Sequence, residues 1–127
     1  MNKLQLYFTW YNYLSSQSYL FYFKKKTLFY FSIFFLAIAQ KGTPANPECG
    51  FSSKAVELLA SLGCAKYATF NILSDNRVRQ GLKAYHAWPT FPQLVVRGKL
   101  VGGLDIMKEM AEEGELKELL DSAAAAQ

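Results

Sequence analysis

"WPTFPQLVVRGKLVGGLDI", residues 88–106, is the stretch of sequence that decides the fold class. Its two prolines end any helix that precedes them, and the β-branched residues at 93–97 predict a strand. Gly98 and Lys99 are typical of a two-residue turn, so residues 100–101 begin the return strand of a hairpin. Gly102 and Gly103 then end that strand.

Helices and one further strand are predicted around this hairpin. The spacing of apolar residues predicts helices over 52–62, from Asp75 to the prolines, and over 105–120 with an interruption at Gly114. Residues 67–72 alternate as a strand does. Helices that alternate with strands in this way predict a layered α/β domain. One strand is then missing from the sheet, and residues 34–39 are the only candidate for it.

Residues 1–40 differ in composition from the rest of the chain. They contain four Lys and no Asp, Glu or Arg, and they are crowded with Phe, Tyr and Leu. The basic run at 24–26, the apolar run at 28–39 and the small residues at its end fit a signal peptide or membrane anchor. The alternative is an artefactual or poorly ordered extension, because the apolar run is shorter than the roughly 20 residues of a membrane span. Cleavage after Ala39 would also remove the candidate strand.

Charge and cysteine content exclude several classes of protein. The net charge of +4 comes from the N-terminal segment, so no nucleic-acid surface and no nucleic-acid partner are predicted. Two cysteines are too few for a disulfide framework, and we expect Cys64 to be a buried small hydrophobe. His86 has no Cys, Asp or Glu at ligand spacing beside it, so a packing or surface role is expected rather than metal binding.

A reactive cysteine is predicted within "NPECGFSSKAVELL", residues 46–59. Cys49 lies at the first turn of a predicted helix, where unpaired N–H groups and the helix dipole favour a thiolate. Lys41 precedes it across a proline-containing loop, and Gly50 permits another molecule to approach closely. The alternative is a cysteine that merely starts a helix. Ser52 occupies the position of the second cysteine of a dithiol motif, so a mixed disulfide at Cys49 would need an outside thiol to resolve it.

Three motifs, "KGTPANPECGFS", "WPTFPQL" and "VGGLDI", resemble those of the monothiol glutaredoxins, whose signature is Cys-Gly-Phe-Ser. The resemblance extends from Lys41 to about Leu120. It implies a thioredoxin-like α/β fold with a central mixed four-stranded sheet flanked by helices, and a glutaredoxin domain over 41–121. The sequence departs from the family at its N-terminus, where an atypical aromatic extension replaces the usual first helix. Residues 122–127 are expected to form a frayed tail.

The resemblance also implies a glutathione groove and a [2Fe–2S] cluster that bridges a homodimer. Cys49 would be the cluster ligand and the site of glutathionylation, and two glutathiones would complete the ligand set. The implied contacts to glutathione come from Lys41, Gly50, Phe51, Arg79, Phe91, Pro92, Gly103, Leu104 and Asp105. Lys41 and Arg79 suit one carboxylate of glutathione and Asp105 suits its ammonium group, although Arg79 as a solvated helix charge is the alternative. The Phe91-Pro92 peptide bond is cis in the family.

Two functions follow from this resemblance. The first is an iron–sulfur carrier or sensor that passes its cluster to acceptor proteins. The second is a glutathione-dependent oxidoreductase that removes glutathione from protein mixed disulfides, with weak activity at most. Ser52 and the loop "TPANPE" favour the first. Both functions need glutathione, so an intracellular location in the cytosol, mitochondrion or plastid is predicted. Membrane association is expected only through residues 1–40. A defective product that folds poorly is a third alternative.

Overall fold

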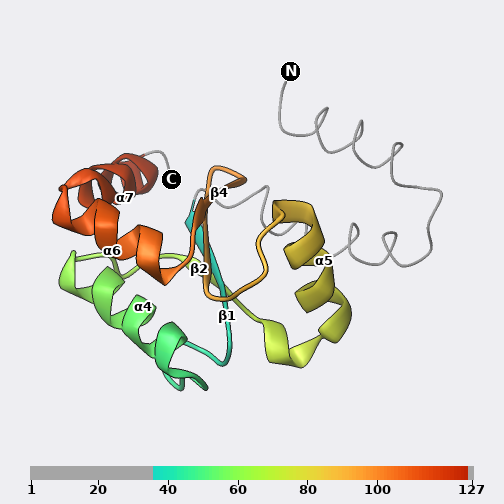
Figure 1. Ribbon diagram of the computed structural model, residues 1–127. Helices are drawn as coiled ribbons and strands as arrows, with labels where there is room; N and C mark the ends of the chain where they lie inside the picture. The colour runs from blue at the N-terminus through green and yellow to red at the C-terminus, as the bar shows by residue number, and fades with distance from the viewer. Residues whose placement is uncertain (1–35, 126–127) are drawn as a thin grey trace.

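The computed structural model describes residues 36–125, in which helices cover both faces of a four-stranded sheet (Figure 1). The strand order is β2-β1-β3-β4, with β1 parallel to β2 and antiparallel to β3, and with β3 antiparallel to β4. The mixed four-stranded sheet flanked by helices is thus confirmed. The strands are β1 (Leu36–Gln40), β2 (Ala68–Asn71), β3 (Gln93–Val96) and β4 (Lys99–Gly102). The helices are α4 (Gly50–Ser61), the 3-10 helix η2 (Ile72–Ser74), α5 (Asn76–His86), α6 (Leu104–Glu112) and α7 (Glu115–Ala125).

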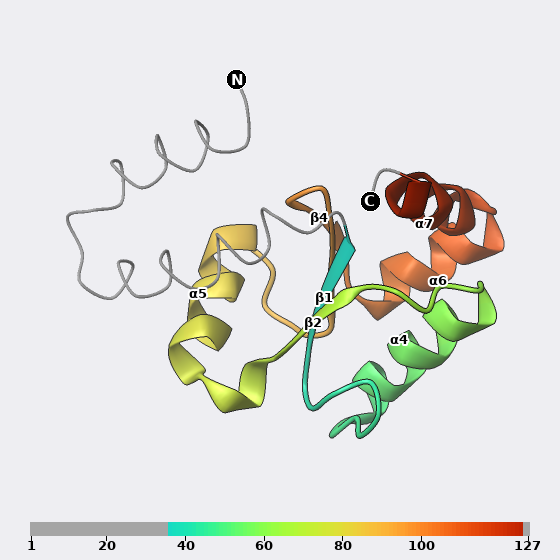
Figure 2. The same cartoon turned by 180° about the vertical axis from the view of Figure 1, so that it is seen from behind.

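Alternating side chains of the central strands divide the core into two clusters, one on each face of the sheet. Leu36 and Ile38 of β1 pack with apolar side chains of α4, α6 and α7. Ala37 and Ala39 point the other way and pack with Val78 and other residues around α5. Figures 1 and 2, taken from opposite sides, show α4, α6 and α7 on one face and α5 on the other.

The first strand is a central strand of the sheet. It lies at Leu36–Gln40, compared with the candidate at 34–39, and all five of its residues are buried. Residues 37–39, the small-residue end of the apolar run, pair with both β2 and β3. A chain cut after Ala39 would therefore lack the strand that joins the two halves of the sheet. The expectations of a signal, an anchor or an aromatic replacement for the first helix lie outside the described residues, and none of the helices within 36–125 is long and apolar enough to cross a bilayer.

The hairpin turn lies one residue earlier than predicted. Its central residues are Arg97 and Gly98, with φ angles of 52° and 78°, and Lys99 already belongs to β4. Two-residue hairpin turns that match the twist of the strands need positive φ at both central positions. The prediction of Gly98 and Lys99 was therefore wrong in its register, because arginine adopts the left-handed conformation here.

The C-terminal segment is ordered for longer than expected. Helix α7 continues through Ala125, so the prediction of a frayed tail from residue 122 was wrong for the part that the structure describes. Ala123 is fully buried and belongs to the same core cluster as Leu116 and Leu120. Its methyl group lies on the apolar face of the helix, and this burial keeps the last turn in place.

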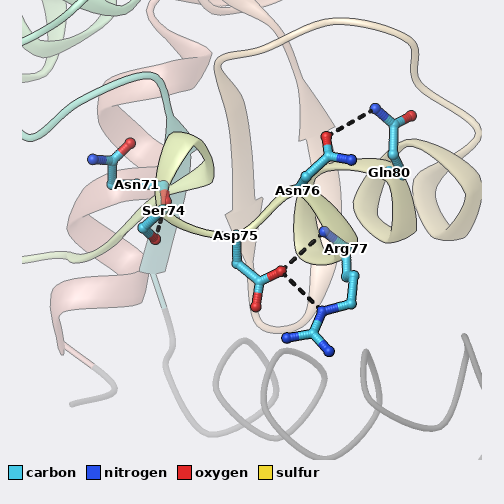
Figure 3. Close-up of polar contacts among 6 residues, drawn as sticks. All are labelled: Asn71, Ser74, Asp75, Asn76, Arg77 and Gln80. Atoms are coloured by element: carbon cyan, nitrogen blue, oxygen red, sulfur yellow. Dashed lines mark hydrogen bonds and ion pairs between the residues drawn. The ribbon is translucent and has the colours of Figure 1, made fainter.

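Side-chain caps fix the start of α5, as Figure 3 shows. The Oδ1 atom of Asp75 accepts a hydrogen bond from the backbone N–H of Arg77 at 2.9 Å, which confirms Asp75 as the predicted N-cap. In the preceding turn the Ser74 hydroxyl donates to the backbone carbonyl of Asn71 at 2.6 Å. These bonds set the position from which α5 extends, and α5 carries two of the cationic side chains described below.

Candidate functional site

Cys49 is the N-cap residue of α4. Its backbone is extended, with φ −154° and ψ 158°, and its sulfur accepts a hydrogen bond from the backbone N–H of Ser52 at 3.3 Å. The side chain is half-buried and forms no disulfide. A sulfur in this position receives an N–H donor and the positive end of the helix dipole, both of which favour its ionised form.

The hydroxyl of Ser52 connects this sulfur to the end of β1. Ser52 is fully buried, and its Oγ accepts a hydrogen bond from the backbone N–H of Lys41 at 3.1 Å. The thiol of Cys49 donates to the same Oγ at 3.2 Å. When the thiol ionises, it no longer donates to Oγ, and the hydroxyl can turn its own proton to the sulfur. The N–H of Lys41 continues to donate to a lone pair of the same oxygen. The serine therefore serves as a hydrogen-bond donor to the thiolate.

The two free cysteines have opposite pKa shifts. Burial alone would raise the pKa of Cys49, but the hydroxyl and N–H of Ser52, the charge of Lys41 and the N–H of Phe51 together hold it below its ordinary value. Burial and the nearby charge of Asp121 raise the pKa of Cys64, against a smaller opposing effect of a backbone hydrogen bond. Cys49 is therefore the thiol poised to react. Cys64 is half-buried rather than fully buried as expected, although it packs against the larger core cluster.

The loop between β1 and α4 holds Lys41 close to the sulfur. The backbone carbonyl of Lys41 accepts from the N–H of Glu48 at 3.0 Å, and the N–H of Gly42 donates to Oδ1 of Asn71 at 3.0 Å. Gly42 has φ 87°, and a Cβ atom there would lie 2.5 Å from the carbonyl oxygen of Asn46. This tight closure requires glycine at position 42.

A cavity of about 370 Å³ opens beside this loop. It lies between the start of α4, the face of α5, the loop at 88–92 and the start of α6. Most of the residues expected at the site line it: Lys41, Phe51, Arg79, Phe91, Pro92, Gly103, Leu104 and Asp105. Cys49 and Gly50 do not line it themselves, but Phe51, which follows them directly, does. The Phe91-Pro92 peptide bond is cis.

Charges are segregated within the cavity lining. Lys41, Arg79 and Lys83 supply three cations, and Asp105 lies in the first turn of α6. Within residues 36–125 none of these four side chains takes part in an ion pair. The Nε atom of Arg79 is buried and has no hydrogen-bond partner among the described residues. A ligand with carboxylates toward α5 and an ammonium group toward Asp105 would complement this arrangement.

Sequence reasoning missed part of the cavity lining. Lys83, Trp88, Pro89, Thr90 and Ile106 also line the cavity. Lys83 follows Arg79 by four residues on α5, a spacing that places both on one helical face and could have predicted it. Trp88 lies within the quoted proline-rich motif, but nothing in the sequence shows that a Cβ atom on Gly103 would approach its Nε1 to 3.3 Å.

The metal chemistry of this site would depend on ligands from outside the chain. Among residues 36–125 there is no group of three or more His, Cys, Asp or Glu side chains that could hold a metal ion. Cys49 offers one thiolate, whereas an iron–sulfur cluster usually needs four. Cys64 follows the other end of the 12-residue helix α4, about 18 Å along its axis, and cannot supply the second.

A comparison with family models shows the family to which the chain belongs. The glutaredoxin model matches residues 22–101, more than half of the chain. The chain belongs to the glutaredoxin family. Its relatives place it in the monothiol branch, because it covers 81% of a monothiol glutaredoxin of Synechocystis, described as uncharacterized and ycf64-like, at 47% identity over 88 residues, or 69% of this chain. The monothiol glutaredoxin-4 of Schizosaccharomyces pombe is 59% identical over 80 residues (63% of this chain and 32% of the relative).

Solved glutaredoxins share the fold. The solution structure of reduced poplar apo GrxS14 is 42% identical, with a TM-score of 0.68 over 80% of this chain and 93% of that chain. A buckwheat glutaredoxin, crystallised in a complex with glutathione, has a TM-score of 0.74 over 87% of this chain and 97% of that chain, at 23% identity. The thioredoxin-like fold is thus confirmed. The chain spans about a third of the length of the yeast relative, and 24% of that of human glutaredoxin-3, to which it is 58% identical.

Proposed function

We propose that this glutaredoxin binds glutathione in the cavity beside Cys49 and that two copies hold a [2Fe–2S] cluster between them for transfer to acceptor proteins or for iron sensing. The observation that carries the proposal is the placement of Cys49. Its sulfur has a lowered pKa and lies next to a cavity whose cations have no ionic partners within residues 36–125.

The charges of glutathione match those of the cavity. Glutathione has two carboxylates and one ammonium group. In the proposal Lys41 and Arg79 pair with the glycine carboxylate, and Asp105 pairs with the ammonium group. The N–H groups that begin α6 bind the γ-glutamyl carboxylate, with Gly103 and Leu104 at this helix start. Phe91 offers backbone hydrogen bonds, next to the cis bond to Pro92.

A shared cluster follows from the single thiolate. Two copies of Cys49 and the thiols of two bound glutathiones make up the four thiolates that a [2Fe–2S] cluster requires. The residues present fit this arrangement, because the sulfur is only half-buried and Phe51 beside it is 63% exposed, which offers an apolar contact for a second copy. Bound between the copies, the cluster would be the cargo that is passed on. This chemistry suits a compartment that contains reduced glutathione.

The oxidoreductase alternative rests on the same thiolate. Cys49 could attack a glutathionylated protein and release its thiol, which leaves glutathione on Cys49 until a second glutathione removes it. Ser52 cannot perform that last step from within the chain, since its hydroxyl is not a thiol and is buried under Lys41. We therefore expect deglutathionylation to be weak at most.

Anaerobic reconstitution tests the proposal. The full chain is incubated with ferric iron, sulfide and reduced glutathione, and its visible absorbance and molar mass are measured. We expect cluster absorbance bands on a dimeric species, with roughly one cluster and two glutathiones per two chains. The bands should be lost from Cys49→Ala and retained in Cys64→Ala.

Two results would count against the cluster proposal. Reconstitution that succeeds equally well when glutathione is omitted would remove glutathione from the ligand set. A colourless protein that deglutathionylates a mixed disulfide rapidly would favour the oxidoreductase instead.

A further inference from the structure

We propose that His86 and Gln93 form a hydrogen-bonded relay that positions the ligand-facing loop at residues 88–92, and that both are therefore positioning residues for glutathione binding. The inference rests on the proposed glutathione site. Neither side chain lines the cavity. They lie behind it, His86 at the end of α5 and Gln93 at the start of β3.

The amide of Gln93 holds the loop at two points. Gln93 is fully buried, and its Nε2 donates to the backbone carbonyls of Trp88 and Thr90, each at 3.2 Å. A carbonyl oxygen can only accept, so the atom that faces both carbonyls must be the NH₂ group. These contacts fix the orientation of the amide and leave its oxygen pointing away from the loop toward α5.

His86 completes the relay from the other side. Its Nδ1 lies 2.7 Å from Oε1 of Gln93, and since Oε1 can only accept, Nδ1 must carry the proton. Burial lowers the pKa of His86, and the bond to Gln93 opposes this only in part, so the ring is neutral at neutral pH. Protonation of Nε2 at lower pH leaves the Nδ1 proton in place, and the relay persists in both charge states.

The loop that the relay holds forms one wall of the cavity. All five residues at 88–92 line the cavity, and the first is also tied to α5, because its backbone N–H donates to the carbonyl of Lys83 at 3.0 Å. The two anchored carbonyls lie on either side of Pro89 and just before Phe91. The relay therefore sets where Phe91 and Pro92 meet a bound tripeptide, although neither His86 nor Gln93 touches it.

Two substitutions of His86 distinguish its role as a hydrogen-bond donor from an effect of side-chain size or of protein stability. His86→Asn keeps an N–H donor near the place of Nδ1, whereas His86→Leu has a similar size and no donor. The probe is glutathione disulfide: the Cys49 thiolate attacks one of its sulfurs, the mixed disulfide forms, and a glutathione thiolate leaves. Peptide mass spectrometry of the full chain gives the equilibrium constant at Cys49 separately from the second free thiol, Cys64. The rate at which iodoacetamide alkylates Cys49 reports on its thiolate without glutathione.

We expect His86→Leu to lower the glutathionylation constant about fivefold, since the buried acceptor Oε1 of Gln93 loses its donor. Gln93→Leu should lower it about tenfold, since both loop anchors are lost. His86→Asn should stay within about twofold of the original chain. The alkylation rate should not change in any of the three. Equal constants for the Leu and Asn variants at position 86, or a parallel fall in alkylation, would overturn the relay.

A second readout is independent of glutathione. His86 is the only histidine of the chain, so the ¹⁵N spectrum of its imidazole needs no assignment. The relay predicts a proton on Nδ1 of the neutral ring, and that preference should disappear in Gln93→Leu. A proton on Nε2 in the original chain would refute the relay. Failure of the original chain to form any mixed disulfide would instead refute the proposed function. The ¹⁵N spectrum would still test the relay in that case.

Discussion

The chemistry of a single-cysteine site depends on the residue that replaces the second cysteine. Ser52 is fully buried, and its hydroxyl accepts a hydrogen bond from the N–H of Lys41 and can donate one to the sulfur of Cys49. A second thiol would have resolved mixed disulfides, whereas this hydroxyl stabilises the thiolate without reacting. Ser52 thus favours a stable thiolate at Cys49 that can bind a ligand without being resolved, which suits a cluster ligand.

Ser52→Ala should raise the pKa of Cys49, because the thiolate loses a hydrogen-bond donor while the neutral thiol loses less. At pH 7 the thiolate fraction falls, and alkylation by iodoacetamide should slow by roughly threefold or more. The difference in rate should vanish at about pH 10, where Cys49 is ionised in the original chain and in the variant alike. Ser53→Ala, the same change on the next residue of α4, is the control and should alkylate at the original rate. An unchanged rate in Ser52→Ala would show that the hydroxyl does not act on the sulfur.

Two buried glutamines should respond oppositely to the same substitution. Gln40 and Gln93 are both fully buried, but neither amide atom of Gln40 has a hydrogen-bond partner among the described residues. Gln40→Met should raise the free energy of unfolding by about 1 kcal/mol, because it removes an unsatisfied buried amide at nearly constant volume. Gln93→Met should lower it by about 2 kcal/mol, because two carbonyls and His86 lose their partner. Urea denaturation measures both, and a loss of stability in Gln40→Met would contradict the assignment of that amide as unsatisfied.

At the scale of elements, local signals in the sequence predicted the helices better than the turns. Asp75 and Gly114 marked a helix start and a helix break, and both are found in the structure. The hairpin turn was misplaced by one residue because nothing local reveals that Arg97 has a positive φ. The C-terminal alanines looked weakly held, and only the burial of Ala123 in the core cluster that contains Leu36 and Ile38 shows otherwise.

Helix α5 should depend on its cap for stability. Asp75→Ala removes the acceptor for the N–H of Arg77 and should lower the free energy of unfolding by about 1 kcal/mol. Asn76→Ala changes the adjacent exposed residue, whose Oδ1 accepts only a long 3.4 Å bond from Gln80, and should stay within about 0.5 kcal/mol of the original chain (Figure 3). Urea denaturation of the two variants side by side tests this, and equal losses would mean that the cap contributes nothing specific.

At the scale of the whole molecule, the fold brings residues of three separate motifs to one cavity. Their family resemblance predicted most of the lining, including Lys41, Arg79 and Asp105. It did not reveal Lys83 or the indole of Trp88, because nothing local shows that the fold brings α5, the loop at 88–92 and the start of α6 to one cavity. Nor did it reveal the role of His86, whose partner Gln93 is seven residues away and becomes adjacent only through the fold.

The central claim is that Cys49 lies beside a cavity shaped for glutathione, and disulfide selectivity tests it most directly. The full chain is equilibrated with glutathione disulfide or with hydroxyethyl disulfide, which has no charges, and the mixed disulfides at Cys49 are quantified by mass spectrometry. We predict a preference for glutathione of at least about tenfold, or about 1.4 kcal/mol. The preference should fall in the Lys41→Ala, Arg79→Ala double variant and persist in Lys54→Ala, which removes an exposed lysine of α4 outside the cavity lining. Equal constants for the two disulfides in the original chain would contradict the account.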